Sequence, residues 1–150
     1  MNLKNKNILL TGGSLGIGKE TAKYLTDKGA NVLITGRSLE RLKKSASYNN
    51  AKTIVFDISN LKEIKEKAKE CIDIFDGKID VLINNAGTGA YRSLDQINIE
   101  DFQKVFNTNV IGLSLLTKEI AELMKSEKYG TIINIGSTAS LRGYKGGTIY

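Results

Sequence analysis

Short apolar segments alternate with longer segments of helical periodicity along the whole of this 150-residue sequence. The segments at 7–10 and 81–83 lack the polar–apolar alternation that marks a strand with one face in water. Strands of this kind, separated by helices, predict a parallel sheet that helices cover on both faces. The fold class is therefore α/β, and residues 1–150 are expected to form a single domain without repeats or linkers.

The periodicities predict where the individual strands and helices lie. The expected strands are at 7–10, 31–35, 53–56, 81–83 and 131–135. The expected helices are at about 16–28, 39–47, 61–72 and 100–126. Gly29 is placed to end the first helix, and Asn60, with Glu63 three residues later, predicts a capping box for the third. The longest helix carries apolar and amide residues at every third or fourth place, which predict its buried face: Phe102, Phe106, Asn109, Leu113, Leu116, Ile120 and Leu123.

The composition excludes several kinds of chemistry. A single cysteine, Cys71, rules out a disulfide framework and a multi-cysteine metal site, and the lack of histidine removes His-based triads and most zinc sites. We therefore expect no metal. The formal charge is +6, but the lysines at 62–69 alternate with glutamates as on a solvated helix face, so no nucleic-acid partner is expected. No segment approaches the roughly 18 apolar residues of a membrane span, and the first residues lack an apolar signal core. These observations predict a cytoplasmic protein without a membrane partner.

A glycine-rich loop at 11–18 joins the first expected strand to the first helix. Backbone N–H groups and the positive end of the helix can meet a phosphate at such a loop, although a structural glycine turn has the same composition. The stretch from Gly13 to Lys19 also fits the first seven positions of a P-loop. Glu20 then stands where a P-loop needs Ser or Thr to bind Mg²⁺, and its carboxylate would repel phosphates. A dinucleotide is therefore favoured over an NTPase-type ligand.

Further motifs follow the glycine loop in a fixed order. They are Thr11-Gly12, Gly16 and Gly18 in the loop, Asn84-Asn85-Ala86-Gly87 after the fourth strand, Asn109 in the long helix, and Ser137 followed 13 residues later by Tyr150. Together they resemble the short-chain dehydrogenase/reductase family, and the resemblance covers the entire chain.

The resemblance implies a Rossmann-type fold and an oxidoreductase that interconverts a carbonyl and a secondary alcohol of a small-molecule substrate. It implies that Tyr150 donates or accepts the proton, that Ser137 polarises the substrate oxygen, and that Asn109 belongs to a proton path. It implies a homodimer or homotetramer built on the long helix. The cofactor contacts that it implies are Gly12, Ser14, Leu15, Gly16, Ile17, Gly18, Asp57, Ile58, Asn85, Ala86 and Gly87.

The family pattern continues beyond the last residue of this sequence. A phenol with a pKa of about 10 is a poor base at neutral pH, and a nearby cation corrects this by stabilising the phenolate. In the family, a lysine soon after the tyrosine supplies that cation. Because the sequence ends at Tyr150, we expect it to be the N-terminal part of a longer enzyme. A catalytically incomplete dinucleotide-binding module is the alternative.

Residues 35–38 predict which dinucleotide is bound. Gly36 falls where NAD-preferring relatives carry an aspartate, and Arg37 follows it. An arginine offers bidentate donors to the 2′-phosphate of NADP, with Ser38 as an additional donor. NADP(H) is therefore preferred over NAD(H), although Arg37 could also be a solvated residue at a helix start. Asp57 is expected either to accept from the adenine amino group or to cap the helix that follows it.

Overall fold

The computed structural model describes residues 2–150 and contains a five-stranded parallel sheet in the order β3-β2-β1-β4-β5. The strands are β1 (Asn7–Leu10), β2 (Asn31–Gly36), β3 (Lys52–Val55), β4 (Val81–Asn84) and β5 (Thr131–Asn134). The α-helices are α1 (Gly16–Asp27), α2 (Leu39–Asn49), α3 (Ile64–Asp73), α4 (Ile99–Phe106) and α5 (Leu113–Ser126). Shorter helical segments are η1 (Leu94–Gln96), the π-helical η2 (Asn107–Gly112) and η3 (Thr138–Ser140).

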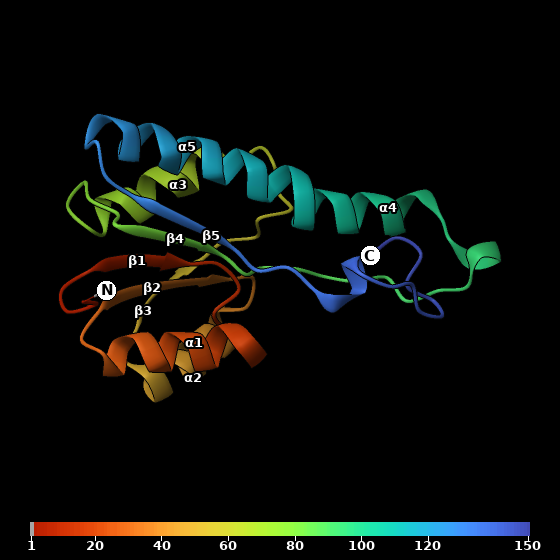
Figure 1. Cartoon of the computed structure of the whole chain (residues 1–150), viewed down its shortest axis with the longest axis horizontal. Helices are drawn as coiled ribbons and strands as arrows, with labels where there is room; N and C mark the ends of the chain where they lie inside the picture. The colour runs from red at the N-terminus through yellow and green to blue at the C-terminus, as the bar shows by residue number, and fades with distance from the viewer. Residues whose placement is uncertain (1) are drawn as a thin grey trace.

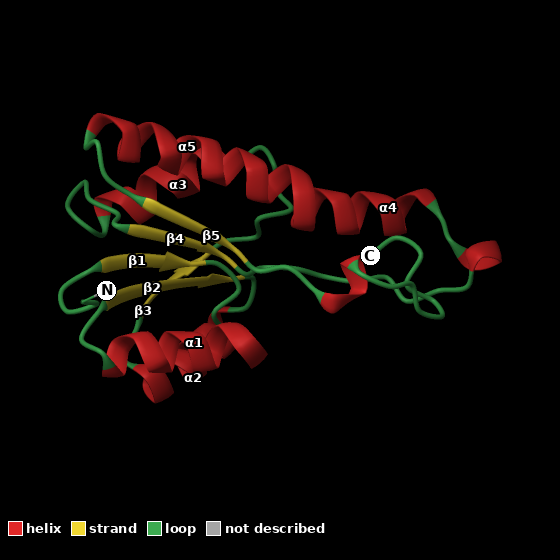
Figure 2. Ribbon diagram, in the orientation of Figure 1, coloured by secondary structure: helices red, strands yellow, loops and turns green. Residues whose placement is uncertain are grey.

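Helices cover the sheet in two layers, as the alternation of elements predicts. Helices α1 and α2 lie on one face, and α3 and α5 lie on the other (Figures 1 and 2). Successive strand residues point to opposite faces, so Ile8 and Leu10 of β1 pack toward α1 and α2, whereas Leu9 packs toward α3 and α5. The α/β fold class is therefore confirmed, and the carboxyl ends of all five strands share one edge of the sheet.

The turn before α3 differs from the predicted capping box at Asn60, which is wrong. Helix α3 begins at Ile64, with Glu63 in the cap position and no side-chain cap hydrogen bond. Asp57 closes the preceding turn instead, because its Oδ1 accepts from the backbone N–H of Ser59 at 3.0 Å and from the Ser59 hydroxyl at 2.7 Å. A further turn of chain therefore separates the strand from the helix, and it moves Asn60 out of the capping position.

The long helix expected at 100–126 is present, but a π-helical segment, η2, joins α4 to α5. A π-turn holds more residues than an α-turn, so it rotates one part of the helix relative to the other. Phe102 and Phe106, expected on the buried face, are 42% and 45% exposed, so that part of the prediction is wrong. Leu116 and Ile120 are fully buried against the sheet, as predicted.

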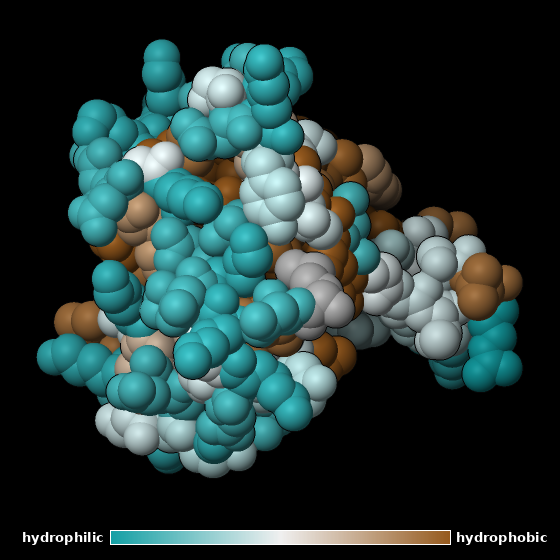
Figure 3. Space-filling model, turned by 60° about the vertical axis from the view of Figure 1, so that its left-hand side comes forward, coloured by the Kyte–Doolittle hydropathy of each residue, from teal (hydrophilic) through white to brown (hydrophobic). Residues whose placement is uncertain are grey.

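Strand β5 is the exposed edge of the sheet. It pairs only with β4 among the described residues, and each of its four residues is exposed. The expected cover on both faces therefore holds for β1 and β4 but not for β5. The face turned forward in Figure 3 is mostly hydrophilic, with hydrophobic residues in patches between. Within residues 2–150, no helix is both long enough and apolar enough to cross a membrane.

Candidate functional site

A cavity of about 360 Å³ opens at the carboxyl ends of the strands, where the loops after β1, β2, β3 and β4 converge. Strand β1 has β2 as its neighbour on one side and β4 on the other, so the cavity lies where the strand order reverses. In open α/β sheets this is the usual position of a ligand site. All the predicted cofactor contacts except Gly16 line it: Gly12, Ser14, Leu15, Ile17, Gly18, Arg37, Ser38, Asp57, Ile58, Asn85, Ala86 and Gly87.

The glycine loop after β1 and the loop after β4 are joined by hydrogen bonds. The Thr11 hydroxyl accepts from the backbone N–H groups of Asn85 and Ala86, both at 3.0 Å. The Asn85 side chain donates to the carbonyl oxygens of Thr11 at 2.9 Å and Gly12 at 3.2 Å. A Cβ on Gly12 would lie 2.9 Å from Ala86 Cα, and one on Gly18 would overlap the Gly12 carbonyl oxygen. These two glycines are therefore required by the close approach of the two loops, whatever ligand they meet.

The N-terminus of α1 lines this cavity, and no side chain within residues 2–150 caps it. Leu15 occupies the cap position and makes no side-chain cap hydrogen bond, and the first turn contains no acidic residue. By contrast, Ser38 caps α2, accepting from the backbone N–H of Arg41 at 3.3 Å, and Asn98 caps α4. The first backbone N–H groups of α1 are thus free for an anionic ligand.

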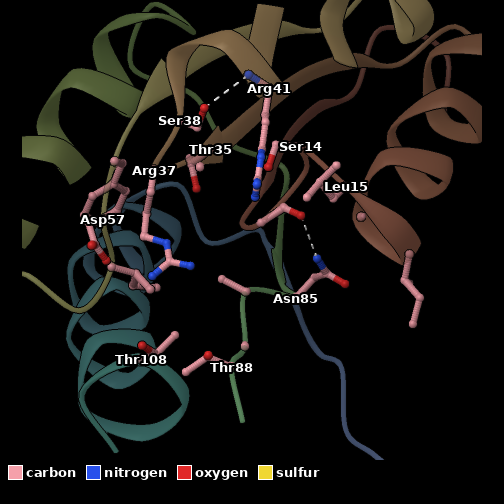
Figure 4. A pocket seen from close by; sticks show the side chains of 18 residues that line it. Ser14, Leu15, Thr35, Arg37, Ser38, Arg41, Asp57, Asn85, Thr88 and Thr108 are labelled. Atoms are coloured by element: carbon pink, nitrogen blue, oxygen red, sulfur yellow. Dashed lines mark hydrogen bonds between the residues drawn. The ribbon is translucent and has the colours of Figure 1, made fainter. Parts of the chain in front are cut away.

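Two arginines enter the cavity from the side of β2 and α2. Arg37 follows the end of β2, and Arg41 lies in the first turn of α2 (Figure 4). Across residues 2–150, neither forms an ion pair with a carboxylate. Asp57 also lines the cavity, and its Oδ1 accepts from Ser59 within the turn before α3. The expectation that Asp57 caps the helix is therefore wrong, because Glu63 occupies the cap position of α3, and the adenine contact stays a prediction.

Sequence reasoning missed several residues that line the cavity: Thr35, Arg41, Phe56, Thr88 and Thr108. Arg41 had a usable signal, because a helix capped by Ser38 places its first turn at the same edge of the sheet as Arg37. Thr108 had none, because its position depends on the π-helical segment that carries it.

Asn109 is held by the chain that follows β4. Its Oδ1 accepts from the backbone N–H of Thr88 at 2.8 Å, and its Nδ2 donates to the Thr88 carbonyl oxygen at 2.9 Å. Both halves of this half-buried amide are therefore satisfied, as an asparagine within an apolar helix face requires. Asn109 does not itself line the cavity, but it fixes the backbone of a residue that does.

Ser137 and Tyr150 both follow β5, but neither is among the described residues that line this cavity. The Ser137 hydroxyl accepts from the backbone N–H of Ala139 at 3.1 Å at the start of η3. Tyr150 is 44% exposed, and its ring centroid lies 6.5 Å from that of Tyr91. Desolvation and the neighbouring hydroxyl of Tyr91 raise the pKa of Tyr144, whose ring centroid lies 6.1 Å from that of Tyr91 at a tilt of 42°.

The segment that carries Tyr150 is fastened to the loop after β4. The backbone N–H of Arg92 donates to the Gly146 carbonyl oxygen at 3.1 Å, while Arg92 Nε pairs with Asp101 Oδ2 of α4 at 2.8 Å. Ala90, Val105 and Ile149 form a small buried cluster beside this contact. The segment that carries Tyr150 and the loop after β4 therefore pack on each other and on α4.

Comparison with known proteins agrees with this geometry. A family model described as short chain dehydrogenase matches residues 6–150. The 3-oxoacyl-[acyl-carrier-protein] reductase FabG of Vibrio cholerae is 33% identical over 152 residues, which cover 100% of this chain and 62% of that protein. An NADP-dependent 3-hydroxy acid dehydrogenase of Schizosaccharomyces pombe is 34% identical, with 99% and 60% covered. The crystal structure of a metagenomic short-chain oxidoreductase in complex with NADP superposes with a TM-score of 0.90 at 30% identity, covering 100% of this chain and 70% of that one. The chain thus spans about three fifths of the length of the two relatives.

Proposed function

This chain belongs to the short-chain dehydrogenase/reductase family, and from that premise we propose that the protein is an NADP(H)-dependent oxidoreductase that interconverts a carbonyl and a secondary alcohol. The observation that carries the cofactor part is the cavity where the uncapped N-terminus of α1 and the unpaired Arg37 face the same space. A molecule with a pyrophosphate and a third phosphate matches both features. The family match also leaves no support for the P-loop alternative.

The residues present fit such a dinucleotide. The bare backbone at Gly12 and Gly18 and the free N–H groups of α1 would hold the pyrophosphate. Arg37 would pair with the 2′-phosphate, because its guanidinium has no carboxylate partner within residues 2–150 and presents parallel donors. Asn85, whose side-chain amide joins the two loops, would hold both loops in place against the cofactor. When bound, the nicotinamide supplies or accepts the hydride.

The chain's own residues would handle the proton. Tyr150 would give its hydroxyl proton to the substrate oxygen during reduction and take it back during oxidation, while Ser137 would hydrogen-bond the same oxygen. A phenol does this at neutral pH only beside a cation, and we propose that a lysine following Tyr150 supplies it here as in the family pattern. Asn109 would act by holding the Thr88 backbone in place beside the cavity.

We also propose that the protein is a homodimer or homotetramer. The helical segment from α4 to α5 exposes apolar side chains that a second copy would cover, including Phe106, Val110 and Leu115, which are 45%, 49% and 37% exposed. Sedimentation velocity on the full-length protein should give a dimer or tetramer, and a monomer at micromolar concentration would refute this part.

The cofactor assignment is tested by titrating the protein with NADPH and NADH and following nucleotide fluorescence. We expect tighter binding of NADPH, and we expect Arg37→Asp to weaken NADPH binding far more than NADH binding. Lys43→Asp makes the same charge change on an exposed face of α2 outside the cavity, so it should leave both affinities unchanged. Equal loss of both nucleotides in Arg37→Asp would refute the assignment.

The catalytic part is tested separately on the full-length protein with a panel of ketones and aldehydes. Tyr150→Phe and Ser137→Ala should abolish NADPH oxidation while leaving NADPH affinity within about twofold of wild type. The second candidate function, a dinucleotide-binding module without turnover, is favoured by the absence of both residues from the cavity lining. It predicts NADPH binding without turnover of any carbonyl in the panel.

A further inference from the structure

Arg41 is the cavity residue that the proposed function leaves without a role. Arg41 enters from the first turn of α2, whereas Arg37 enters from the end of β2, and in Figure 4 the Arg41 side chain points toward Ser14 of the glycine loop, which lines the same cavity. Neither arginine is paired with a carboxylate within residues 2–150. Two unpaired cations that share one cavity repel each other until an anion lies between them.

Arg41 is held in this place by contacts on either side of it. Its backbone N–H donates to the Ser38 hydroxyl at 3.3 Å, which sets the start of α2. The next residue, Leu42, is fully buried, and the buried Ser45 hydroxyl donates to the Gly13 carbonyl oxygen at 2.8 Å. The helix that carries Arg41 is therefore tied directly to the glycine loop, which fixes where the Arg41 side chain starts relative to that loop.

A side chain at Gly36 would lie close to the glycine loop and to α2. A Cβ on Gly36 would lie 3.1 Å from Ser14 Oγ, which is closer than most contacts in folded proteins, and 3.4 Å from Leu42 Cδ2. An aspartate there, which would select the free ribose hydroxyls of NAD, would crowd the glycine loop. The space is therefore bordered by guanidinium and hydroxyl donors, a set that suits a phosphate monoester.

We propose that Arg41 is a second specificity-determining residue for NADP(H), contacting the 2′-phosphate from the α2 side while Arg37 contacts it from the β2 side. This inference rests on the proposed NADP(H) function and deepens it. The hydroxyls of Ser14 and Ser38 complete the donor set, since Ser38 uses its oxygen as an acceptor in the cap and keeps its proton free to donate. The phosphate would thereby bridge Arg41 in the first turn of α2 and Arg37, the residue that follows β2.

The test compares nucleotides that differ only in the 2′-phosphate. Wild type, Arg41→Ala, Arg41→Lys and Arg37→Ala are titrated calorimetrically with NADPH and NADH, and with 2′,5′-ADP and 5′-AMP as shorter probes. Lys44→Ala is the matched control, because it removes one positive charge from α2 outside the cavity. Thermal unfolding of each variant checks that the fold is retained.

We expect Arg41→Ala to weaken the binding of NADPH and of 2′,5′-ADP about 10-fold. This is the lower end of the range for losing a hydrogen bond to a charged group, and it applies because Arg41 is exposed. NADH and 5′-AMP should change by less than about twofold, Arg41→Lys should recover part of the loss, and Lys44→Ala should match wild type. The loss should shrink at high salt, because exposed charges are screened.

Two results would overturn the inference while leaving the proposed function intact. One is a loss of 2′-phosphate selectivity in Arg37→Ala but not in Arg41→Ala. The other is an equal weakening of NADPH and NADH in Arg41→Ala, which would place Arg41 on a part of the cofactor that both share. Wild-type protein that binds both dinucleotides equally, or neither, would instead overturn the proposed function, and with it the inference.

Discussion

Gly112 is the residue at which the π-helical segment meets the loop after β3, and we predict that Gly112→Ala destabilises the protein. Gly112 is buried, and a Cβ built on it would overlap the carbonyl oxygen of Ile58 and approach that of Asn107 at 2.6 Å. Both obstacles are backbone atoms, so no change of side-chain rotamer relieves them. The helix, the Ile58 loop or both must therefore move.

The magnitude follows from two opposing effects. Overpacking a rigid interior site costs about 3 kcal/mol at the upper end of its usual range, which applies here because backbone atoms are overlapped. Replacing glycine by alanine within a helix recovers about 1 kcal/mol of helix propensity. The net loss is about 2 kcal/mol, which for a domain of this size lowers the midpoint of thermal unfolding by roughly 4–8 °C.

Urea and thermal unfolding, followed by circular dichroism, measure this loss. Gly143→Ala is the control, because a Cβ there meets nothing within 4 Å and the backbone is not left-handed, so its stability should stay within about 0.5 kcal/mol of wild type. Since Ile58 lines the cavity, Gly112→Ala should also weaken NADPH binding. A variant that is as stable as wild type or more stable would refute the reasoning, because helix propensity alone would then govern the site.

Three further predictions concern single residues elsewhere in the fold. Burial raises the pKa of Asp80, but the backbone N–H of Asn7 at 2.9 Å and the ammonium of Lys6 at 3.1 Å outweigh it and hold that pKa below its usual value. The stability that this carboxylate provides is present above its unfolded pKa of about 3.9 and is lost as pH falls through the folded pKa. In Asp80→Asn, the free energy of unfolding measured in urea should therefore fall less steeply between pH 5 and 2 than in wild type. Equal slopes for wild type and variant would contradict this. Burial raises the pKa of Cys71 from 9.0 to about 12, so at pH 8 the folded protein should hold about a thousandfold less thiolate than an unperturbed cysteine. A thiol reagent should therefore react with Cys71 only when the protein unfolds. Equal reaction rates with and without urea would contradict this prediction. Asn109→Leu removes both hydrogen bonds to the Thr88 backbone and should speed hydrogen exchange of the Thr88 amide at least about tenfold. Asn109→Asp keeps the acceptor oxygen and should have a smaller effect. Unchanged exchange in Asn109→Leu would show that Asn109 does not hold the Thr88 backbone.

The order of elements and most of the cavity residues could be predicted without the structure, because both depend on local information. Strand and helix periodicities are properties of neighbouring residues. Once the strands are parallel, the residues that follow them must meet at one edge of the sheet, which brings Gly12, Arg37, Asp57 and Asn85 together. Their clustering therefore required no knowledge of side-chain packing.

Helix phase and hydrogen-bond partners had to come from the tertiary structure. The apolar spacing of the sequence predicts Phe102 on the buried face, but Phe102 is exposed in α4, and a π-turn that ends at the buried Gly112 separates α4 from α5. The sequence likewise predicts that Asn109 needs hydrogen-bond partners. It does not predict that the Thr88 backbone supplies both of them.

The sequence by itself therefore determined the strand–helix order, the family and the edge of the sheet that forms the cavity, since these follow from periodicity and motif spacing. Only the tertiary structure decided that Arg41 joins Arg37 in the cavity and that Ser137 and Tyr150 lie outside its lining. The physical reason is that these placements depend on contacts between distant segments, such as the hydrogen bond from Ser45 to Gly13 that ties α2 to the glycine loop. No pattern within either segment encodes such a contact.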